Sequence, residues 1–145
     1  MCYNSVKISC LSVGSHAQRN MLPAIEQSAS CDLIGVFTRR ADVRSKVSTM
    51  FNCKNYPSEE RLFTDNESDL VYISSPLSQH FRQAYEAIEA GKSILIEKTA
   101  FKNVSETQLI LDLAKRKKVN VNEAFMYRFH SQFKYLLDLL KGDKY

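Results

Sequence analysis

The chain has 145 residues, of which 44% are hydrophobic and 25% are charged, and its formal net charge is +4. These values are typical of one ordinary globular domain, and no apolar run reaches the roughly 20 residues that a membrane span needs. The densest basic run, at residues 115–118, falls at a predicted helix end and is not interleaved with aromatic side chains, which disfavours a nucleic-acid surface.

The N-terminal residues lack the basic and apolar regions of a signal peptide, and the four cysteines form no CxxC pair. We therefore expect reduced thiols, a cytoplasmic location and no metal site. We expect neither a membrane nor a nucleic acid as a partner.

Apolar strands alternate with amphipathic helices in the first half of the chain. The predicted elements are a strand at 6–11, a helix at 16–27, a strand at 33–37, a helix at 42–50, a short strand near 52–56 and a short helix from 57 to 62. Met21, Leu22 and Ile25 share one face of the first helix, which indicates that this face is buried.

The alternation continues in the second half. The predicted elements are a strand at 70–73, a helix at 79–90, a strand at 93–96, a helix at 105–115 that a capping box opens at Ser105, a strand at 119–122 and a helix at 131–140. Strands and helices at this spacing predict βαβ units in one domain over residues 1–145. The expected fold is α/β and doubly wound, with a mostly parallel Rossmann sheet of about six strands and helices on both faces.

The turn between the first strand and the first helix has part of a dinucleotide fingerprint. Gly14 takes the position where the backbone approaches a pyrophosphate, and Ala17 takes the small helix-packing position. Ser12 stands where glycine is usual, so a positive φ there would carry strain. The candidate cofactor-binding residues of this loop are Ser12, Gly14, Ser15, His16 and Ala17. The alternative is an ordinary strand-to-helix turn that needed one glycine.

The end of the second strand bears on the choice between NAD and NADP. Thr38, Arg39 and Arg40 follow it, and the next carboxylate is Asp42. Guanidinium groups suit a 2′-phosphate, whereas an acidic residue suits the ribose hydroxyls of NAD. The sequence therefore favours NADP, with NAD as the alternative cofactor and two solvated arginines as the structural alternative.

Five segments, at residues 12–24, 69–80, 90–96, 97–99 and 123–130, resemble the N-terminal half of the glucose-fructose oxidoreductase / inositol dehydrogenase (Gfo/Idh/MocA) family. Glu97-Lys98-Thr99 stands where the family has Glu-Lys-Pro, and residues 123–130 match the segment that leads out of the Rossmann domain. Thr99 in place of proline removes a constraint on the backbone of the preceding residue.

The resemblance implies roles for several residues. Lys98 is then the active-site lysine beside the nicotinamide and the substrate hydroxyl, and Glu97 binds the ribose end of the cofactor. The other implied contacts are Ser75, Pro76 and His80 in the cofactor cleft, and Tyr127 and Arg128 near the nicotinamide and the substrate. The structural alternatives are a surface lysine at 98, a helix-start role for His80, and packing of Tyr127 against Phe125 and Phe129.

By this resemblance the chain is an NAD(P)-dependent oxidoreductase domain that moves hydride between nicotinamide and a hydroxyl or carbonyl carbon of a sugar or cyclic polyol. Family members continue into a C-terminal substrate domain, which these 145 residues do not contain. Catalysis by this chain alone is therefore expected to be incomplete. The alternative is a non-catalytic dinucleotide-binding or partner-binding module. Apolar surface left uncovered near the last helix favours a homo-oligomer.

Overall fold

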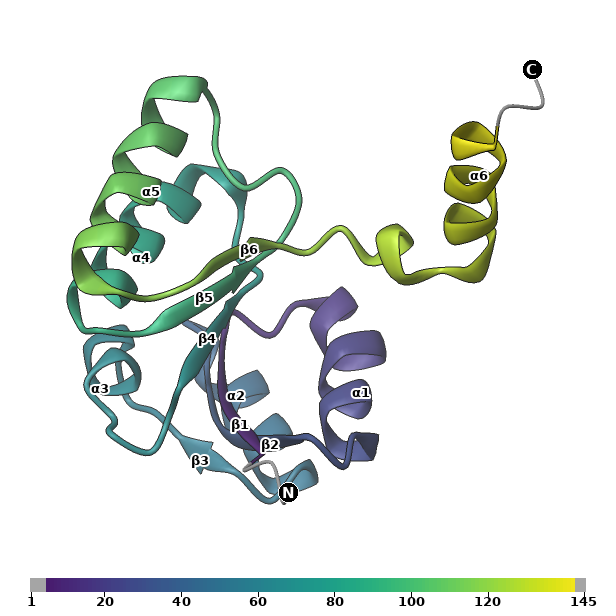
Figure 1. The fold of residues 1–145 in the computed structure, drawn as a ribbon. Coiled ribbons are helices and arrows are strands. Elements are labelled where there is room, and N and C mark those ends of the chain that lie inside the picture. Colours follow the sequence, from purple (N-terminus) through teal and green to yellow (C-terminus); the bar gives the residue numbers. More distant parts are fainter. Residues whose placement is uncertain (1–4, 143–145) are drawn as a thin grey trace.

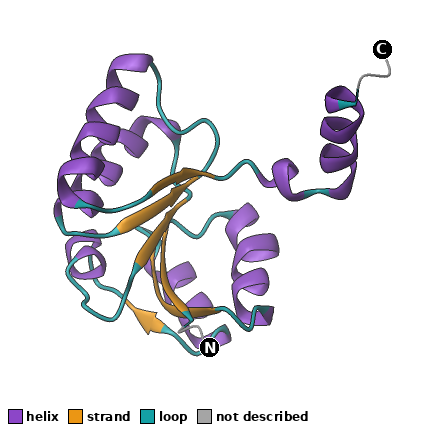
Figure 2. Cartoon of the chain, in the orientation of Figure 1, coloured by secondary structure: helices purple, strands orange, loops and turns teal. Residues whose placement is uncertain are grey.

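A computed structural model describes residues 5–142 of the chain, in which the strands form a sheet with helices on both sides (Figure 2). The sheet is parallel, with the strand order β3-β2-β1-β4-β5-β6. The strands are β1 (Val6–Leu11), β2 (Cys31–Phe37), β3 (Lys54–Asn55), β4 (Leu70–Ile73), β5 (Ser93–Ile96) and β6 (Val121–Glu123). The predicted doubly wound α/β fold is confirmed. This strand order is the one that dinucleotide-binding Rossmann domains have.

Helices cover both faces of the sheet. The covering helices are η1 (Ala17–Met21), α1 (Leu22–Gln27), α2 (Ala41–Met50), α3 (Glu59–Phe63), α4 (Leu77–Glu89) and α5 (Val104–Lys117), and the chain continues into η2 (Met126–Phe129) and α6 (Ser131–Lys141). Figure 1 shows α1 and α2 on one side of the sheet and α3, α4 and α5 on the other. Right-handed crossovers impose this arrangement, because the direction of strand addition reverses between β1 and β4. None of the helices within residues 5–142 is long and apolar enough to cross a bilayer.

The two faces of the sheet carry separate apolar cores because side chains alternate along each strand. Val71 and Ile73 of β4 are fully buried in the core beneath α3, α4 and α5, whereas Tyr72 between them is fully buried in the core beneath α1 and α2. The α6 helix has no buried residue and stands away from the sheet, beyond β6 (Figure 1).

The first helix and α5 differ from the prediction in their first turns. The helix predicted over 16–27 contains a π-helical turn, η1, immediately before α1. Pro23 has no amide hydrogen and its ring crowds the preceding turn, which disturbs the regular hydrogen-bond ladder there. The helix predicted from Ser105 instead begins at Val104, because the side chain of Asn103 accepts the amide hydrogen of Glu106 at 2.8 Å.

Other boundaries shift by a few residues. The strand predicted at 119–122 is observed as Val121–Glu123, because the amide of Val119 still closes the end of α5 by donating to the carbonyl of Ala114 at 3.1 Å. The strand near 52–56 shortens to two residues. The helix predicted at 79–90 begins directly after Pro76, at Leu77. Such shifts are expected where caps and turns compete with the periodic pattern.

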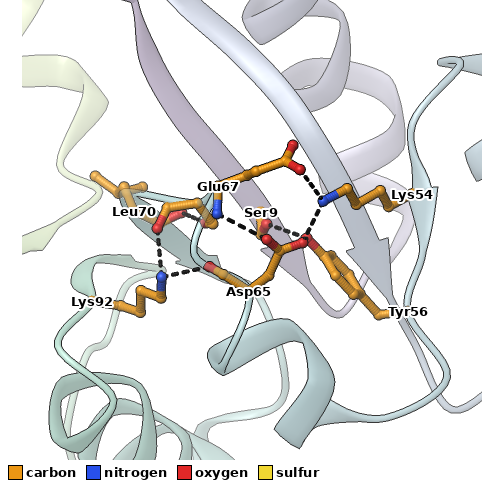
Figure 3. Close-up of polar contacts among 8 residues, drawn as sticks. Ser9, Lys54, Tyr56, Asp65, Glu67, Leu70 and Lys92 are labelled. Atoms are coloured by element: carbon orange, nitrogen blue, oxygen red, sulfur yellow. Dashed lines mark hydrogen bonds and ion pairs between the residues drawn. The ribbon is translucent and has the colours of Figure 1, made fainter.

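A polar network, which we call the Asp65 network, joins β3 to the loop before β4 (Figure 3). Asp65 accepts hydrogen bonds at 2.7 Å from both Lys54 Nζ and Tyr56 Oη, and at 2.8 Å from the amide of Glu67. Lys92, just before β5, donates to the carbonyl of Asp65 at 2.6 Å. The network lies at the amino ends of β4 and β5, and its charges satisfy one another, so it stabilises the fold away from the strands' carboxyl ends.

Candidate functional site

Four loops meet at the carboxyl-terminal edge of the sheet. They follow β1 (residues 12–14), β2 (38–40), β4 (74–76) and β5 (97–103). Because all strands are parallel, every one of these loops emerges at the same edge, and the strand order reverses between β1 and β4. In open α/β sheets the ligand crevice forms at such a switch point. These loops contain nine of the 15 residues that the sequence predicts as site residues.

The loop after β1 is tied down on both sides of Ser12. Its amide donates to the carbonyl of Phe37 at 2.8 Å, and its carbonyl accepts a hydrogen bond from the hydroxyl of Ser74. Its φ is +68°, the left-handed conformation for which glycine is the usual residue. The expectation of strain at this position is thus supported by the backbone itself.

The strain at Ser12 can be measured. Ser12→Gly should raise the free energy of unfolding by about 0.5 kcal/mol, since it removes a steric penalty of about 1 kcal/mol and adds part of that back as chain entropy. Ser12→Val should lower it, because a β-branched side chain tolerates the left-handed region least. Urea denaturation of the three proteins tests the order Gly, Ser, Val. A valine variant as stable as the glycine variant would contradict the strain.

Nothing in the fold of residues 5–142 requires a glycine at position 14. A Cβ built there meets no heavy atom within 4 Å, and its φ lies outside the left-handed region. Gly35 is the opposite case, since a Cβ there would lie 2.4 Å from Cε2 of Tyr56. The open space over Gly14 adjoins the start of a helix at Ser15, whose amides favour an anion. Such open space beside a strand-to-helix turn is what a close approach of a pyrophosphate to the backbone requires.

The loop after β2 places Thr38, Arg39 and Arg40 together. Arg39 and Arg40 are both exposed, and Arg40 pairs with Asp42 at 3.2 Å between side chains that are 74% and 72% exposed. Arg44, on the first turns of α2, donates to the carbonyl of Thr38 at 3.0 Å. Arg44 is not among the residues predicted from the sequence, because it lies within α2 and does not directly follow a strand.

Glu97 joins the loop after β5 to the first helix. Its carboxylate accepts a hydrogen bond from Tyr72 Oη at 2.7 Å and lies 3.5 Å from Nε2 of His16. Burial, and then the hydrogen bond to Glu97, raise the pKa of Tyr72 well above its usual range, so Tyr72 remains a neutral donor. Tyr72 was also missed, although a phenol inside an apolar strand signals a buried partner.

A cleft of about 700 Å³ opens beside this network, between the first helix, the ends of β5 and β6, and the segment after β6. His16, Glu97 and Arg128 contribute polar groups to it, while Leu70 and Leu95 form part of its apolar floor. The structure thus brings together three candidate residues that lie 81 and 31 positions apart along the chain. Mostly apolar walls with a few converging polar groups are typical of small-molecule sites.

Lys98 is exposed and directly follows Glu97, which lines this cleft, and hydrogen bonds hold the loop that carries it. His80 is 2% exposed, and its Nδ1 lies 3.1 Å from the carbonyl oxygen of Thr99 and 3.0 Å from that of Ala100. Its Nε2 lies 2.8 Å from the carbonyl oxygen of Ser75. His80 therefore connects the loops after β4 and β5, and its contact with the cofactor stays a prediction. These contacts constrain the Lys98 loop despite the missing proline.

The remaining candidates lie around this edge. The hydroxyl of Ser75 bonds to the side chain of Gln83, and Pro76 is the exposed residue before α4. Tyr127 is 51% exposed, and its ring packs at 5.7 Å from that of Phe125 and at 5.0 Å from that of Phe133. Tyr127 lines a separate hollow of about 600 Å³ next to α6, so the structure does not bring it into the cleft with Arg128.

Comparison with known proteins agrees with this geometry. The model of the Gfo/Idh/MocA oxidoreductase family, described as an NAD-binding Rossmann fold, matches residues 8–125. A dTDP-3,4-didehydro-2,6-dideoxy-α-D-glucose 3-reductase of Saccharopolyspora spinosa is 29% identical over 94% of this chain and 41% of its own length. A D-xylose 1-dehydrogenase (NADP⁺) of Hypocrea jecorina is 31% identical over 80% of this chain and 28% of its own length.

Among solved structures, a 3-ketoreductase from Actinomadura kijaniata in complex with NADP superposes with a TM-score of 0.90. Its identity is 23%, over 94% of this chain and 44% of that one, so it supports the fold alone. The chain spans about two fifths of the length of the first of these curated relatives. By its sequence match and its strand order, the chain belongs to the Gfo/Idh/MocA oxidoreductase family and contains that family's NAD-binding Rossmann domain.

Proposed function

We propose that the chain is the cofactor-binding part of an NADP-dependent oxidoreductase that acts on a hydroxyl or carbonyl carbon of a sugar-like substrate. Gly14 carries this proposal, because the fold does not require a glycine there and a pyrophosphate does. The two relatives named above are a reductase of a nucleotide-linked sugar and a dehydrogenase of xylose, which supports a sugar-like substrate. Location in the cytoplasm stays a prediction from the sequence.

The chain's own residues divide the work between the two ends of the cofactor. The residues after β1 would hold the pyrophosphate, and Thr38, Arg39 and Arg40 would face the adenosine ribose. Glu97 would bind the nicotinamide ribose, since its carboxylate is already oriented by Tyr72. When bound, the nicotinamide supplies the hydride chemistry.

Lys98 would act on the substrate side. An ammonium group at this place can donate a hydrogen bond to the substrate oxygen and move the proton that accompanies hydride transfer. The contacts of His80 with the carbonyls of Thr99 and Ala100 keep the backbone next to Lys98 in place. Arg128, in the same cleft as Glu97, would approach the substrate from the segment after β6.

Isothermal titration calorimetry of the unmodified 145-residue chain with NADPH and with NADH tests the cofactor assignment. We expect NADPH to bind more tightly than NADH. Absence of binding of either nucleotide at millimolar concentration would contradict the proposal, and equal affinities would remove the role of Arg39 and Arg40. Lys98→Ala should leave both affinities nearly unchanged, because its role lies with the substrate.

A second candidate is a non-catalytic module that binds a dinucleotide and a protein partner. The observation in its favour is the apolar surface of η2 and α6, where Phe129 is 79% exposed and Leu140 is 72% exposed. Self-association through this surface stays a prediction. In a turnover assay over a panel of sugars, oxidation that Lys98→Ala abolishes supports the enzyme and contradicts the module. Binding without turnover is expected both of the module and of the cofactor-binding part of an enzyme on its own.

A further inference from the structure

The guanidinium of Arg44 contacts three neighbouring residues at the edge of the sheet where β2 and β3 end. Nη1 donates to the carbonyl of Thr38 at 3.0 Å, and Nε donates to Oδ1 of Asn55 at 2.6 Å. The guanidinium carbon lies 5.5 Å from the centre of the Phe37 ring, within the range of a cation–π interaction. Arg44 is therefore a fixed positive charge that also holds the backbone of the loop after β2.

The two arginines of that loop are held less firmly. Arg39 is exposed, and the pairing of Arg40 with Asp42 joins two side chains that are each more than 70% exposed. Exposed pairs of this kind contribute little and exchange readily with solvent. Arg44 is half-buried, and its position depends on β3 lying next to β2, because Asn55 belongs to β3.

A fixed guanidinium matters most for a dianionic ligand. NADPH differs from NADH by a phosphate on the 2′ oxygen of the adenosine ribose, which binds at the end of the second strand of this fold. Arginine has five N–H donors, of which two are used in the contacts above, so donors remain for a phosphate oxygen. A side chain that is already ordered loses less entropy on binding than a free one.

We propose that Arg44 determines the preference for NADPH over NADH, by fixing the Thr38–Arg40 loop and by supplying an ordered positive charge next to it. This inference rests on the proposed function, because it concerns the adenosine end of the same cofactor. Arg44 acts on the loop through the carbonyl of Thr38, so it is a positioning residue for Arg39 and Arg40 as well as a source of charge.

The test compares Arg44→Met, Arg44→Lys and the matched control Lys46→Met. Lys46 is an exposed cation on the same helix, so its variant removes one positive charge without touching the loop. Dissociation constants for NADPH and NADH are measured by nicotinamide fluorescence, with thermal unfolding as a check on folding. Arg44→Met should weaken NADPH binding about tenfold, as expected for a lost contact with a charged group, and should change NADH binding by less than about twofold.

Arg44→Lys should recover part of the preference, because it keeps the charge and loses the planar fork. Lys46→Met should leave the ratio of the two constants unchanged. An unchanged ratio in both Arg44 variants, or an equal loss for both nucleotides, overturns the role of Arg44. Absence of binding of either nucleotide by the unmodified chain overturns the proposed function and this inference together. If Arg44→Met does not fold, the ratio in Arg44→Lys decides.

Discussion

Gly14→Ala should weaken dinucleotide binding about 10- to 100-fold while leaving the fold intact. The loss corresponds to the roughly 1–3 kcal/mol that an added methyl group imposes in a filled space, here at the closest approach of the pyrophosphate. The free energy of unfolding should rise by about 0.4–1 kcal/mol, because alanine restricts the unfolded chain and a Cβ at Gly14 meets no protein atom within 4 Å. Nucleotide titration and urea denaturation measure the two effects.

Gly35→Ala is the matched control and should behave in the opposite way. Its Cβ would lie 2.4 Å from Cε2 of Tyr56 and 2.8 Å from Cβ of Lys54, so the fold should lose about 1–3 kcal/mol of stability. Where the variant remains folded, its nucleotide affinity should be nearly that of the unmodified chain. Wild-type affinity in Gly14→Ala would show that the loop after β1 is not a phosphate loop.

Asp65→Asn should remove about 2 kcal/mol of stability at neutral pH, an effect that disappears in acid. Burial would raise the pKa of Asp65, but the hydrogen bonds from Lys54, the amide of Glu67 and Tyr56 outweigh it and lower the pKa to about 2. The side chain is 14% exposed, so solvent screens these contacts weakly.

The sign of the pH dependence follows from the direction of that shift. An unfolded aspartate titrates near pH 3.9, so the contribution of Asp65 is fully present above about pH 4 and is lost as the pH falls toward 2. The two proteins should therefore differ in stability at pH 7 and converge only as the pH falls to about 2. Urea denaturation between pH 2 and 7 checks this expectation.

Glu67→Gln provides the control, because Glu67 pairs with the same lysine at 3.1 Å through a side chain that is 62% exposed. Its loss should change stability by less than about 0.5 kcal/mol. Equal losses in the two variants would mean that the Asp65 network owes its effect to net charge and not to its buried hydrogen bonds.

The order and type of the elements could be predicted because each rests on local periodicity. β1 and β5 are observed over the predicted residues, and the crossover rule then restricts the topology. The predicted helix boundaries were wrong where two neighbouring residues could each cap the helix. Ser105 begins a capping-box pattern, but the N-cap is Asn103, two residues before it. The side chain of Asn103 accepts the amide hydrogen of Glu106, three residues later.

The candidate site could be predicted only in part. Residues that follow a strand directly, such as Gly14 and Lys98, are placed by the parallel sheet alone, because every strand ends at the same edge. Arg44 and Tyr72 could not be found in this way. Their partners, Asn55 and Glu97, become neighbours only when β3 pairs with β2 and β5 pairs with β4. Such contacts depend on strand pairing, which local sequence patterns do not encode.

The α6 helix has a consequence for how the chain unfolds. It comprises 11 residues, none of them buried, and isolated helices shorter than about 12–15 residues are marginal in water. Its amide hydrogens should therefore exchange with solvent through local opening, while those of β1, β4 and β5 exchange only when the whole sheet opens. We therefore expect the cooperative folding unit to end near β6 and α6 to open separately, with a helical population that depends on what packs against its leucines.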